Sequence, residues 1–184
     1  NDWELTAGVR YDHYSDFGDT VNPRLALVWS TSRNLTTKLI YGEAFRAPSF
    51  AQTRAINNPL VLGNSELDPT TSMNFDVMAE HYFKSVGIIS GGLFYKDIQD
   101  FVYTFQSENE DGFEVYQPLN GDDASVFGAE VSFQRRLDFL PGFAKNFSVY
   151  LNYTYLTSST DGIRNEDGEE RTDLDLPQTA PNMF

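Results

Sequence analysis

The side chains best suited to contacting a bound molecule are a group of aromatic residues in and beside the acid-rich stretch 107–123. They are Tyr103, Phe105, Phe113 and Tyr116. Aromatic rings give large, rigid contact surfaces to a ligand, although packing of one loop against another is the plain alternative. Arg46 is a further candidate, because it precedes Ala-Pro-Ser, where Pro48 is expected to end a strand. Its guanidinium either contacts a ligand, pairs with carboxylates or is solvated.

No catalytic or metal-binding pattern is found in the sequence. A nucleophile elbow, a phosphate loop and the HExxH zinc motif do not occur. Asn109-Glu-Asp-Gly112 and Asn165-Glu-Asp-Gly168 faintly resemble calcium loops. With the glycine as sixth residue, the first and last ligand positions of an EF-hand fall on Ser107 and Pro118, or on Ile163 and Leu174. We therefore expect no enzyme activity, no cofactor and no built metal site, and only looser binding of divalent cations to surface carboxylates stays open.

The composition excludes several classes of function. The chain has 184 residues, with 27 acidic and 13 basic side chains and a net charge of -14. This balance argues against binding nucleic acid and against docking on anionic lipid surfaces. Cysteine does not occur. No apolar run approaches the roughly 18 residues of a membrane helix, but the alternating strands of a transmembrane barrel leave mean hydropathy low.

Alternation of apolar and polar residues is the main structural signal. Its clearest instance is the segment around 74–84, where Phe75, Val77 and Ala79 alternate with charged or amide side chains. About seven such strands are expected, each near the roughly 9 to 11 residues that cross a membrane. The register within 88–105 is not fixed by the pattern, and the pattern gives no reason for Glu43 on an apolar face.

Short and long connections alternate between these strands. Short links are expected at 30–34, 85–87 and 138–146, and long ones from about 12 to 23, 48 to 71, 106 to 125 and 157 to 181. Outer-membrane barrels have short periplasmic turns and long extracellular loops. A soluble β-sandwich shows the same alternation within strands but has no reason for alternating loop lengths. An antiparallel transmembrane β-barrel is therefore favoured over the sandwich.

The apolar face must be the one that meets lipid. An Arg or Lys on the lipid side at mid-membrane costs roughly 2–4 kcal/mol. Turning the strand at 74–84 the other way would expose Asp76, Glu80 and Lys84 together. Aromatic residues near strand ends are expected to form an interfacial girdle. The residues expected in it are Trp3, Tyr11, Trp29, Phe83 and Tyr155, and His81 is expected near the same boundary rather than on a metal.

The sequence is expected to be part of a larger barrel. Seven strands would leave two unpaired edges in lipid, where backbone groups find no partner. Pro177 and Pro181 cannot lie in a central ladder strand, so Phe184 is expected to begin a strand. We therefore expect residues 1–184 to form a partial barrel domain, with the remaining strands outside it.

Six short motifs, in order along the chain, resemble the TonB-dependent receptors, particularly those of Bacteroidetes-like bacteria. They are Tyr41–Phe50 (YGEAFRAPSF), Gly63–Asp76 (GNSELDPTTSMNFD), Gly92–Phe101 (GLFYKDIQDF), Gly128-Ala-Glu130, Asn152–Tyr155 (NYTY) and Leu176–Asn182 (LPQTAPN). This resemblance implies a 22-stranded barrel in the Gram-negative outer membrane. It also implies an N-terminal plug domain and the protein TonB as partners, both outside this chain.

The resemblance implies import of a scarce, large solute, most often a ferric siderophore. Glycan or peptide import is the alternative within the family. A passive porin would differ in lacking the plug. The alternative from another class is a soluble β-sandwich adhesin or carbohydrate-binding module. Nothing in the sequence itself names the solute.

Overall fold

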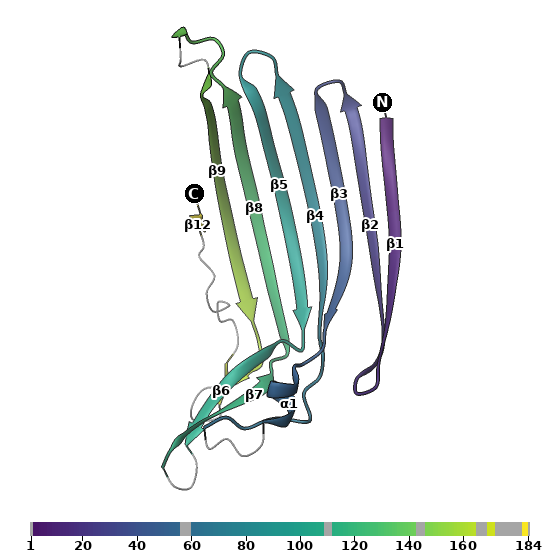
Figure 1. Ribbon diagram of the computed structural model, residues 1–184, viewed down its shortest axis with the longest axis vertical. Helices are drawn as coiled ribbons and strands as arrows, with labels where there is room; N and C mark the ends of the chain where they lie inside the picture. The colour runs from purple at the N-terminus through teal and green to yellow at the C-terminus, as the bar shows by residue number, and fades with distance from the viewer. Residues whose placement is uncertain are drawn as a thin grey trace.

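A computed structural model shows one long, curved antiparallel sheet with smaller elements at one end (Figure 1). The structure describes residues 2–55, 60–108, 112–142, 146–164, 169–171 and 182–183. Seven long strands form the sheet in sequence order. They are β1 (Asp2–Tyr14), β2 (Gly18–Ser32), β3 (Leu35–Arg46), β4 (Thr70–Phe83), β5 (Gly87–Gln99), β8 (Asp123–Arg136) and β9 (Ser148–Thr160). The expected seven strands are confirmed, but each is 12 to 15 residues long, more than a membrane crossing needs.

The short elements lie beside this sheet. β12 (Asn182–Met183) adds to the free edge of β9, so a strand begins there as expected, while Phe184 and the rest of the 176–182 motif lie outside the described residues. β6 (Val102–Glu108) pairs with β7 (Glu114–Asn120), and β10 (Ile163–Arg164) with β11 (Glu170–Arg171). The one described helix is α1 (Phe50–Arg54), which is capped by the Ser49 side chain. No helix in the described part of the chain is long and apolar enough to cross a membrane.

The connections divide between the two ends of the sheet as predicted. The β2–β3, β4–β5 and β8–β9 connections share one end, and the β1–β2 turn, α1 and the β6–β7 hairpin share the other (Figure 1). We call these ends the periplasmic rim and the extracellular rim, since the long β3–β4 and β5–β8 connections lie at the second end and long loops are extracellular in such barrels. Two expected loops were wrong in detail. The segment 12–23 is mostly strand, with only residues 15–17 between β1 and β2, and the segment 106–125 contains β7.

Both errors have the same physical cause. Polar residues near a barrel rim are wet on one or both faces, so they do not oppose strand formation there. Pro23, which suggested a loop, lies opposite Val9 but beyond the last β2–β3 pair at Arg24. Its missing N–H therefore removes no bond between β2 and β3. The unresolved register of 88–105 is now fixed, because β5 pairs with β4 and β8 and ends at Gln99.

One face of the sheet is a belt of uncharged residues. Cross-strand rows place Leu27, Leu39, Val77 and Leu93 side by side, and Trp3 opposite Trp29. On β4 the belt from the aromatic row at Phe75 to the strand end at Phe83, which His81 interrupts, is about 27 Å along the strand at ~3.4 Å per residue. At a tilt of ~40° this is about 20 Å of height, near the apolar band of known barrels. The belt is the lipid-facing surface.

Because the belt faces lipid, no second layer of protein is needed to cover its apolar residues. Its large apolar residues are exposed, with Trp3 68%, Val9 72% and Leu93 52% accessible. A sandwich would bury this face under a second long sheet, and the described residues form only one. The most buried apolar residues, Leu67, Val115 and Ala124, instead lie toward the extracellular rim, where loops pack on the sheet.

Glu43 lies where the belt ends. Tyr41, Phe75 and Tyr95 form an aromatic row across β3, β4 and β5. The Tyr41 hydroxyl donates to Glu43, and the Tyr95 hydroxyl donates to Asp97 at 3.3 Å. The carboxylates therefore lie one step outside the apolar band, and the tyrosines bridge lipid and water. Tyr155, expected in a girdle, instead lies in the middle row opposite Ala129, whereas His81 lies near the periplasmic rim as expected.

Candidate functional site

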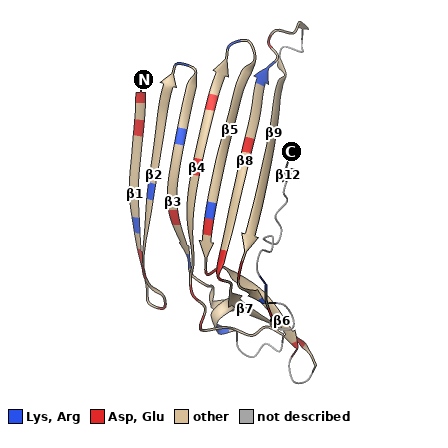
Figure 2. Cartoon of the chain, turned by 180° about the vertical axis from the view of Figure 1, so that it is seen from behind, with Lys and Arg blue, Asp and Glu red and all other residues tan. Residues whose placement is uncertain are grey.

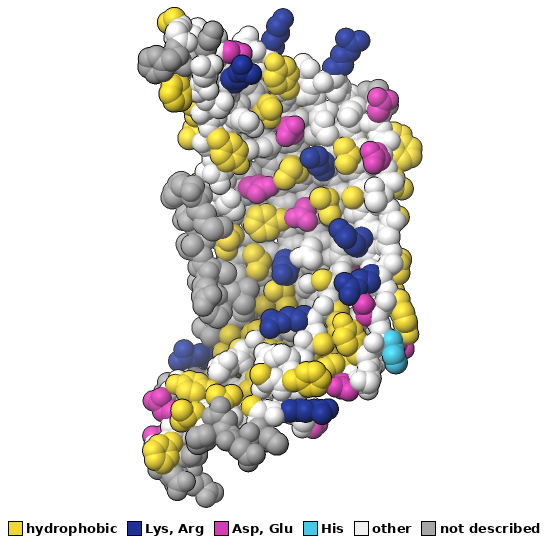
Figure 3. All heavy atoms as spheres, viewed as in Figure 1, with side chains coloured by type: hydrophobic (Ala, Val, Ile, Leu, Met, Phe, Trp, Pro, Cys, Tyr) yellow, Lys and Arg dark blue, Asp and Glu magenta, His cyan; other side chains and the backbone are white. Residues whose placement is uncertain are grey.

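The face opposite the lipid belt carries most of the charged residues of the long strands. Paired positions share a face, so Arg24 lies beside Gly42 and Asn74, and Asn74 lies beside Lys96. We call this the lumen face. Between the two rims, Figure 3 shows acidic side chains mainly in the half nearer the periplasmic rim and basic side chains mainly in the half nearer the extracellular rim, and further basic side chains stand at the periplasmic rim itself. The lumen is therefore divided into two zones of opposite charge.

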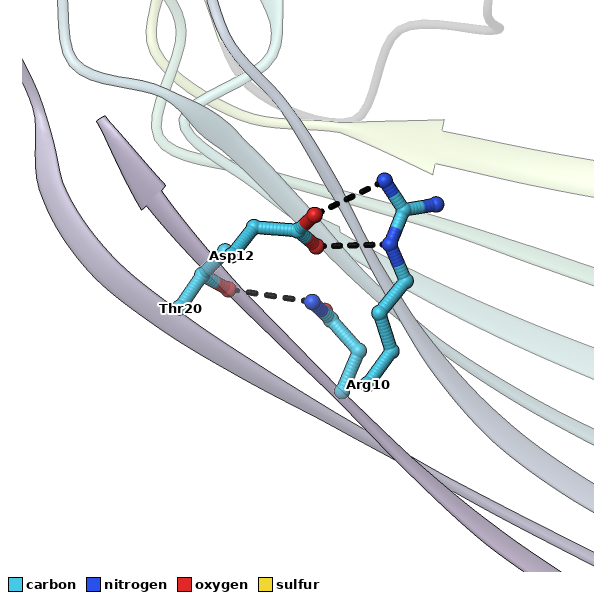
Figure 4. Close-up of polar contacts among 4 residues, drawn as sticks. Arg10, Asp12 and Thr20 are labelled. Carbon is cyan, nitrogen blue, oxygen red and sulfur yellow. Dashed lines mark hydrogen bonds and ion pairs between the residues drawn. The ribbon is translucent and has the colours of Figure 1, made fainter.

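The basic zone consists of four side chains at lumen-facing positions of four strands. They are Arg10 on β1, Arg24 on β2, Arg46 on β3 and Lys96 on β5. Arg10 and Asp12 form a two-point ion pair, with Nε–Oδ2 at 2.7 Å and a second hydrogen bond to Oδ1 at 2.9 Å (Figure 4). Within the described residues the other three cations form no ion pair. Their positive charge is available to an anion.

A hollow adjoins the basic zone. Its volume is about 410 Å³, and its lining includes Arg10, Arg24, Asn22 and Asn74 together with the carboxylates Asp12 and Glu43. Asn22 is nearly buried and donates to Thr20 Oγ1 at 3.2 Å, which fixes the neighbouring wall (Figure 4). The hollow is open, so it presents hydrogen-bond donors and carboxylates without enclosing a small ligand. Its guanidinium and amide groups can donate to an anionic or oxygen-rich surface, and its carboxylate Asp12 is already paired with Arg10.

The acidic zone lies deeper toward the periplasmic rim. Lumen-facing positions there hold Glu4, Asp76, Glu80 and Glu130, with Lys38 among them. Glu130 packs against Gly92, whose missing side chain leaves room for it. An anion attracted to the outer half therefore meets repulsion in the inner half.

The extracellular segments are tied into one packed unit. Tyr116 N donates to Leu60 O at 2.8 Å, and Leu62 N donates to Tyr116 O at 2.9 Å, which joins the 60–69 segment to β7. Asn120 Nδ2 donates to Asp100 O at 2.7 Å and Asp68 O at 3.0 Å, and its Oδ1 accepts from Asp68 N at 2.8 Å. Asn120 is thus the centre of this unit.

The GN-x-x-L-x-P motif, residues 63–69, also holds the 60–69 segment against β7. Asn64 Nδ2 donates to Pro118 O at 3.1 Å, and Asn64 Oδ1 accepts from Glu66 N at 3.0 Å. Leu67 is only 3% exposed. A Cβ on Gly63 would lie 3.0 Å from Thr53 O and closer to Ala55 N, so only glycine lets the segment approach α1. The motif is explained by packing of the extracellular segments.

Four carboxylates gather where β5, β8 and this unit meet. Burial raises the pKa of Asp100 above its ordinary value of 3.8, and the charges of Asp68, Asp123 and Asp122 raise it further. Asp100 also has a φ of 53°, a left-handed conformation that Asp tolerates better than most residues. In the described part of the chain no group of three or more such side chains has the geometry to hold a metal ion.

The structure does not gather the five predicted contact residues into one cluster. Arg46 ends β3 opposite Thr70 and belongs to the basic zone. Tyr103 and Phe105 lie on β6, where the Tyr103 hydroxyl accepts from Arg164 N at 3.1 Å. Tyr116 lies on β7 and donates to Glu114 Oε2 at 3.2 Å, and Phe113 is 62% exposed beside the start of β7. These hydrogen bonds show that both tyrosines help to pack the extracellular segments. Contact of any of the five residues with a ligand stays a prediction.

Sequence reasoning missed three of the four basic-zone residues. Arg10 and Arg24 lie on the polar side of their strands, which the alternation already placed in the lumen, whereas the pattern left the facing of Lys96 open. What the sequence lacked was the register between strands, which brings residues 86 positions apart in the chain to one half of one face.

Comparison with known proteins agrees with this geometry. The chain is 27% identical over 165 residues to hemoglobin-binding protein A of Haemophilus influenzae, and 27% over 146 residues to the ferrienterobactin receptor of Escherichia coli. These matches cover 82% and 70% of the chain but only 16% and 19% of the relatives. The chain therefore spans less than a fifth of the length of these relatives.

Solved structures show the same fold. The siderophore receptor PirA of Pseudomonas aeruginosa superimposes with a TM-score of 0.69 at 23% identity, covering 87% of this chain and 34% of that protein. The family model described as TonB dependent receptor-like, beta-barrel, matches residues 1–184. A match along the whole chain, a lipid-facing belt and a charged lumen face agree, and the chain belongs to the TonB-dependent receptor β-barrel family.

Proposed function

We propose that this chain is part of the wall of an outer-membrane, TonB-dependent importer whose solute is a ferric siderophore. The basic zone carries the proposal, because Arg24, Arg46 and Lys96 offer unneutralised charge just inside the extracellular rim. Siderophores bind Fe³⁺ through oxygen donors, and catecholate complexes carry net negative charge. Relatives named as ferrienterobactin and ferric enterobactin receptors support this solute class.

The proposed importer has further parts outside the described sheet. Its remaining strands would close the barrel, and a plug domain would fill it against the lumen face. TonB, powered by the inner-membrane proton gradient, would drive release of the solute. The acidic zone fits this division, since it disfavours an anion in the inner half of the lumen until the plug moves. No covalent reaction of the solute is proposed.

The first test measures binding of ferric enterobactin, as a probe, to the full-length protein in detergent. Arg24→Gln and Lys96→Gln should each raise Kd about tenfold or more, because a hydrogen bond to a charged group contributes ~1.5–3 kcal/mol. Lys38→Gln is the matched control, since it removes the same charge from the acidic zone of the same face. Its Kd should change less than about twofold.

Two outcomes would redirect the proposal. Equal effects of Lys38→Gln and Arg24→Gln would show that the basic zone does not contact the solute. Tight binding of a neutral oligosaccharide, unaffected by either basic-zone variant, would favour the glycan importer instead. Uptake of the bound solute should also cease in cells that lack TonB, whereas uptake that persists there would indicate a passive pore.

A further inference from the structure

Four basic side chains lie along the periplasmic rim, with Arg135 at a belt-facing and Arg136 at a lumen-facing position of β8. Arg33 lies between β2 and β3, Lys84 follows β4, and Arg135 and Arg136 end β8. We call them the rim cluster. Figure 2 shows Lys or Arg at the β2–β3 and β4–β5 turns and at the end of β8. Because β2, β3, β4, β5 and β8 are successive in the sheet, these positions follow one another along the rim.

The charges of the rim cluster are not neutralised within the described structure. The ion pairs formed by described residues all lie toward the extracellular rim, at Asp12, Asp19 and Asp16. Asp138 shares the rim but forms no ion pair there with another described residue. Arg33, Lys84 and Arg136 are exposed, and Arg135 is held over the Phe139 ring at 4.3 Å. The four cations of the cluster thus form no ion pair with any described residue.

Exposed apolar side chains lie between these cations. Phe83 is 41% exposed, Val86 42%, Phe139 59% and Phe147 56%. In water such a mixture would expose apolar surface at a cost of ~25 cal/mol per Å². At a membrane boundary it places rings among acyl chains and cations among headgroups.

The opposite boundary of the lipid belt has the reverse charge. Glu43, Asp97 and Asp123 occupy the outward-facing positions beyond the tyrosine row. The net charge of -14 argued against docking on anionic lipid, but this charge is unevenly distributed. At the periplasmic boundary, exposed cations stand beside exposed apolar residues at the edge of the lipid-facing wall.

We propose that the rim cluster binds the phosphate groups of anionic glycerophospholipids in the periplasmic leaflet. Arg and Lys donate charge-assisted hydrogen bonds to phosphate oxygens, and each basic residue near an anionic membrane surface contributes ~1 kcal/mol. A zwitterionic headgroup carries its own cation and gains less. The site is a property of the barrel wall and does not depend on which solute is imported.

The test measures lipid binding to the full-length protein by native mass spectrometry in detergent doped with phosphatidylglycerol or phosphatidylcholine. The double variant Arg33→Gln/Lys84→Gln changes two exposed turn residues outside the strands. It should weaken phosphatidylglycerol binding by about 25-fold, or fivefold for each cation, and leave phosphatidylcholine unchanged. The matched control Arg54→Gln/Arg164→Gln removes equal charge at the extracellular rim and should change neither lipid.

A second measurement needs no variant. Raising salt from about 0.05 to 0.5 M should weaken phosphatidylglycerol binding to the unaltered protein and spare phosphatidylcholine, because salt screens exposed charges. Equal affinity for the two lipids, or equal losses in the test and control variants, would overturn the proposal. So would binding of purified lipid A that depends on Arg33 and Lys84 while phosphatidylglycerol binding does not.

Discussion

Gly128 of β8 lies beneath the ring of Phe94 on β5, and replacing it with alanine should destabilise the sheet. The two residues are cross-strand partners on the lumen face, and Gly128 is buried. A Cβ at position 128 would lie 2.6 and 2.7 Å from Cε1 and Cε2 of Phe94, and closer to Cζ. Ordinary contacts of this kind are 3.4–4 Å. The ring would therefore have to move by about 1 Å.

The expected magnitude comes from two opposing effects. Overpacking of a fitted contact costs ~1–3 kcal/mol. Alanine also restricts the unfolded chain more than glycine does, which stabilises by ~0.4–1 kcal/mol. The ring can turn partly aside, so we expect Gly128→Ala to lower the free energy of unfolding by about 1–2 kcal/mol. Phe94→Leu removes the outer ring carbons, so alanine should be tolerated in that background.

The assay is urea unfolding of the full-length protein in micelles, monitored by tryptophan fluorescence. Gly91→Ala is the control, because a Cβ there would meet Glu130 O at 3.6 Å and Val131 Cγ2 at 4.0 Å, both ordinary contacts. The double variant Gly128→Ala/Phe94→Leu should recover about 1 kcal/mol relative to the sum of the single changes. The reasoning fails if Gly128→Ala is as stable as Gly91→Ala, or if the two changes are additive.

Three further predictions concern the rim and the belt. Asn120→Ala should speed proteolytic cleavage within residues 60–69 and 102–120 several-fold, because three hydrogen bonds to Asp68 and Asp100 are lost; unchanged cleavage would remove Asn120 from its central role. The raised pKa of Asp100 means that the folded state holds its proton more tightly than the unfolded state, so stability falls as pH rises from about 3.8 through the raised value. Asp100→Asn should therefore slow cleavage at pH 7.5 and reduce the difference between pH 4.5 and 7.5, and an unaltered pH profile would contradict the burial of this carboxyl. Val77→Arg on the belt should cost ~2–4 kcal/mol of unfolding free energy, whereas Met78→Arg on the lumen face should cost less than about 1 kcal/mol; equal costs would mean that the two faces are not lipid and lumen.

The strand pattern could be predicted from sequence because lipid demands it. A charged residue on the belt is costly, so β4 and β8 alternate almost without exception, and their faces follow directly. The order of the strands also predicts at which end of the sheet each connection lies, because neighbouring strands are antiparallel. Near the rims this demand ends, and there the prediction was weakest, as β7 and the start of β2 show.

The candidate site was harder to predict because it depends on register. Arg46 was found from its neighbouring proline, a local signal. Arg24 and Lys96 come together only when β2, β3, β4 and β5 pair with fixed offsets. Likewise, Glu43 is unexplained along its own strand and becomes clear only beside Tyr41 and the aromatic row to which Tyr41 belongs.

The most direct test of the account asks which face of the sheet meets lipid. Residues 1–184 contain no cysteine, so in a full-length protein freed of any other cysteine, single cysteines can replace Val77 and Leu39 on the belt, and Met78 and Lys38 on the lumen face. Spin labels at these positions report collisions with oxygen, which concentrates in lipid, and with a water-soluble nickel chelate. The account predicts oxygen access at positions 77 and 39 and nickel access at 78 and 38 in the reconstituted full-length protein. Nickel access at all four positions, or no alternation between neighbours, would contradict the barrel wall described here.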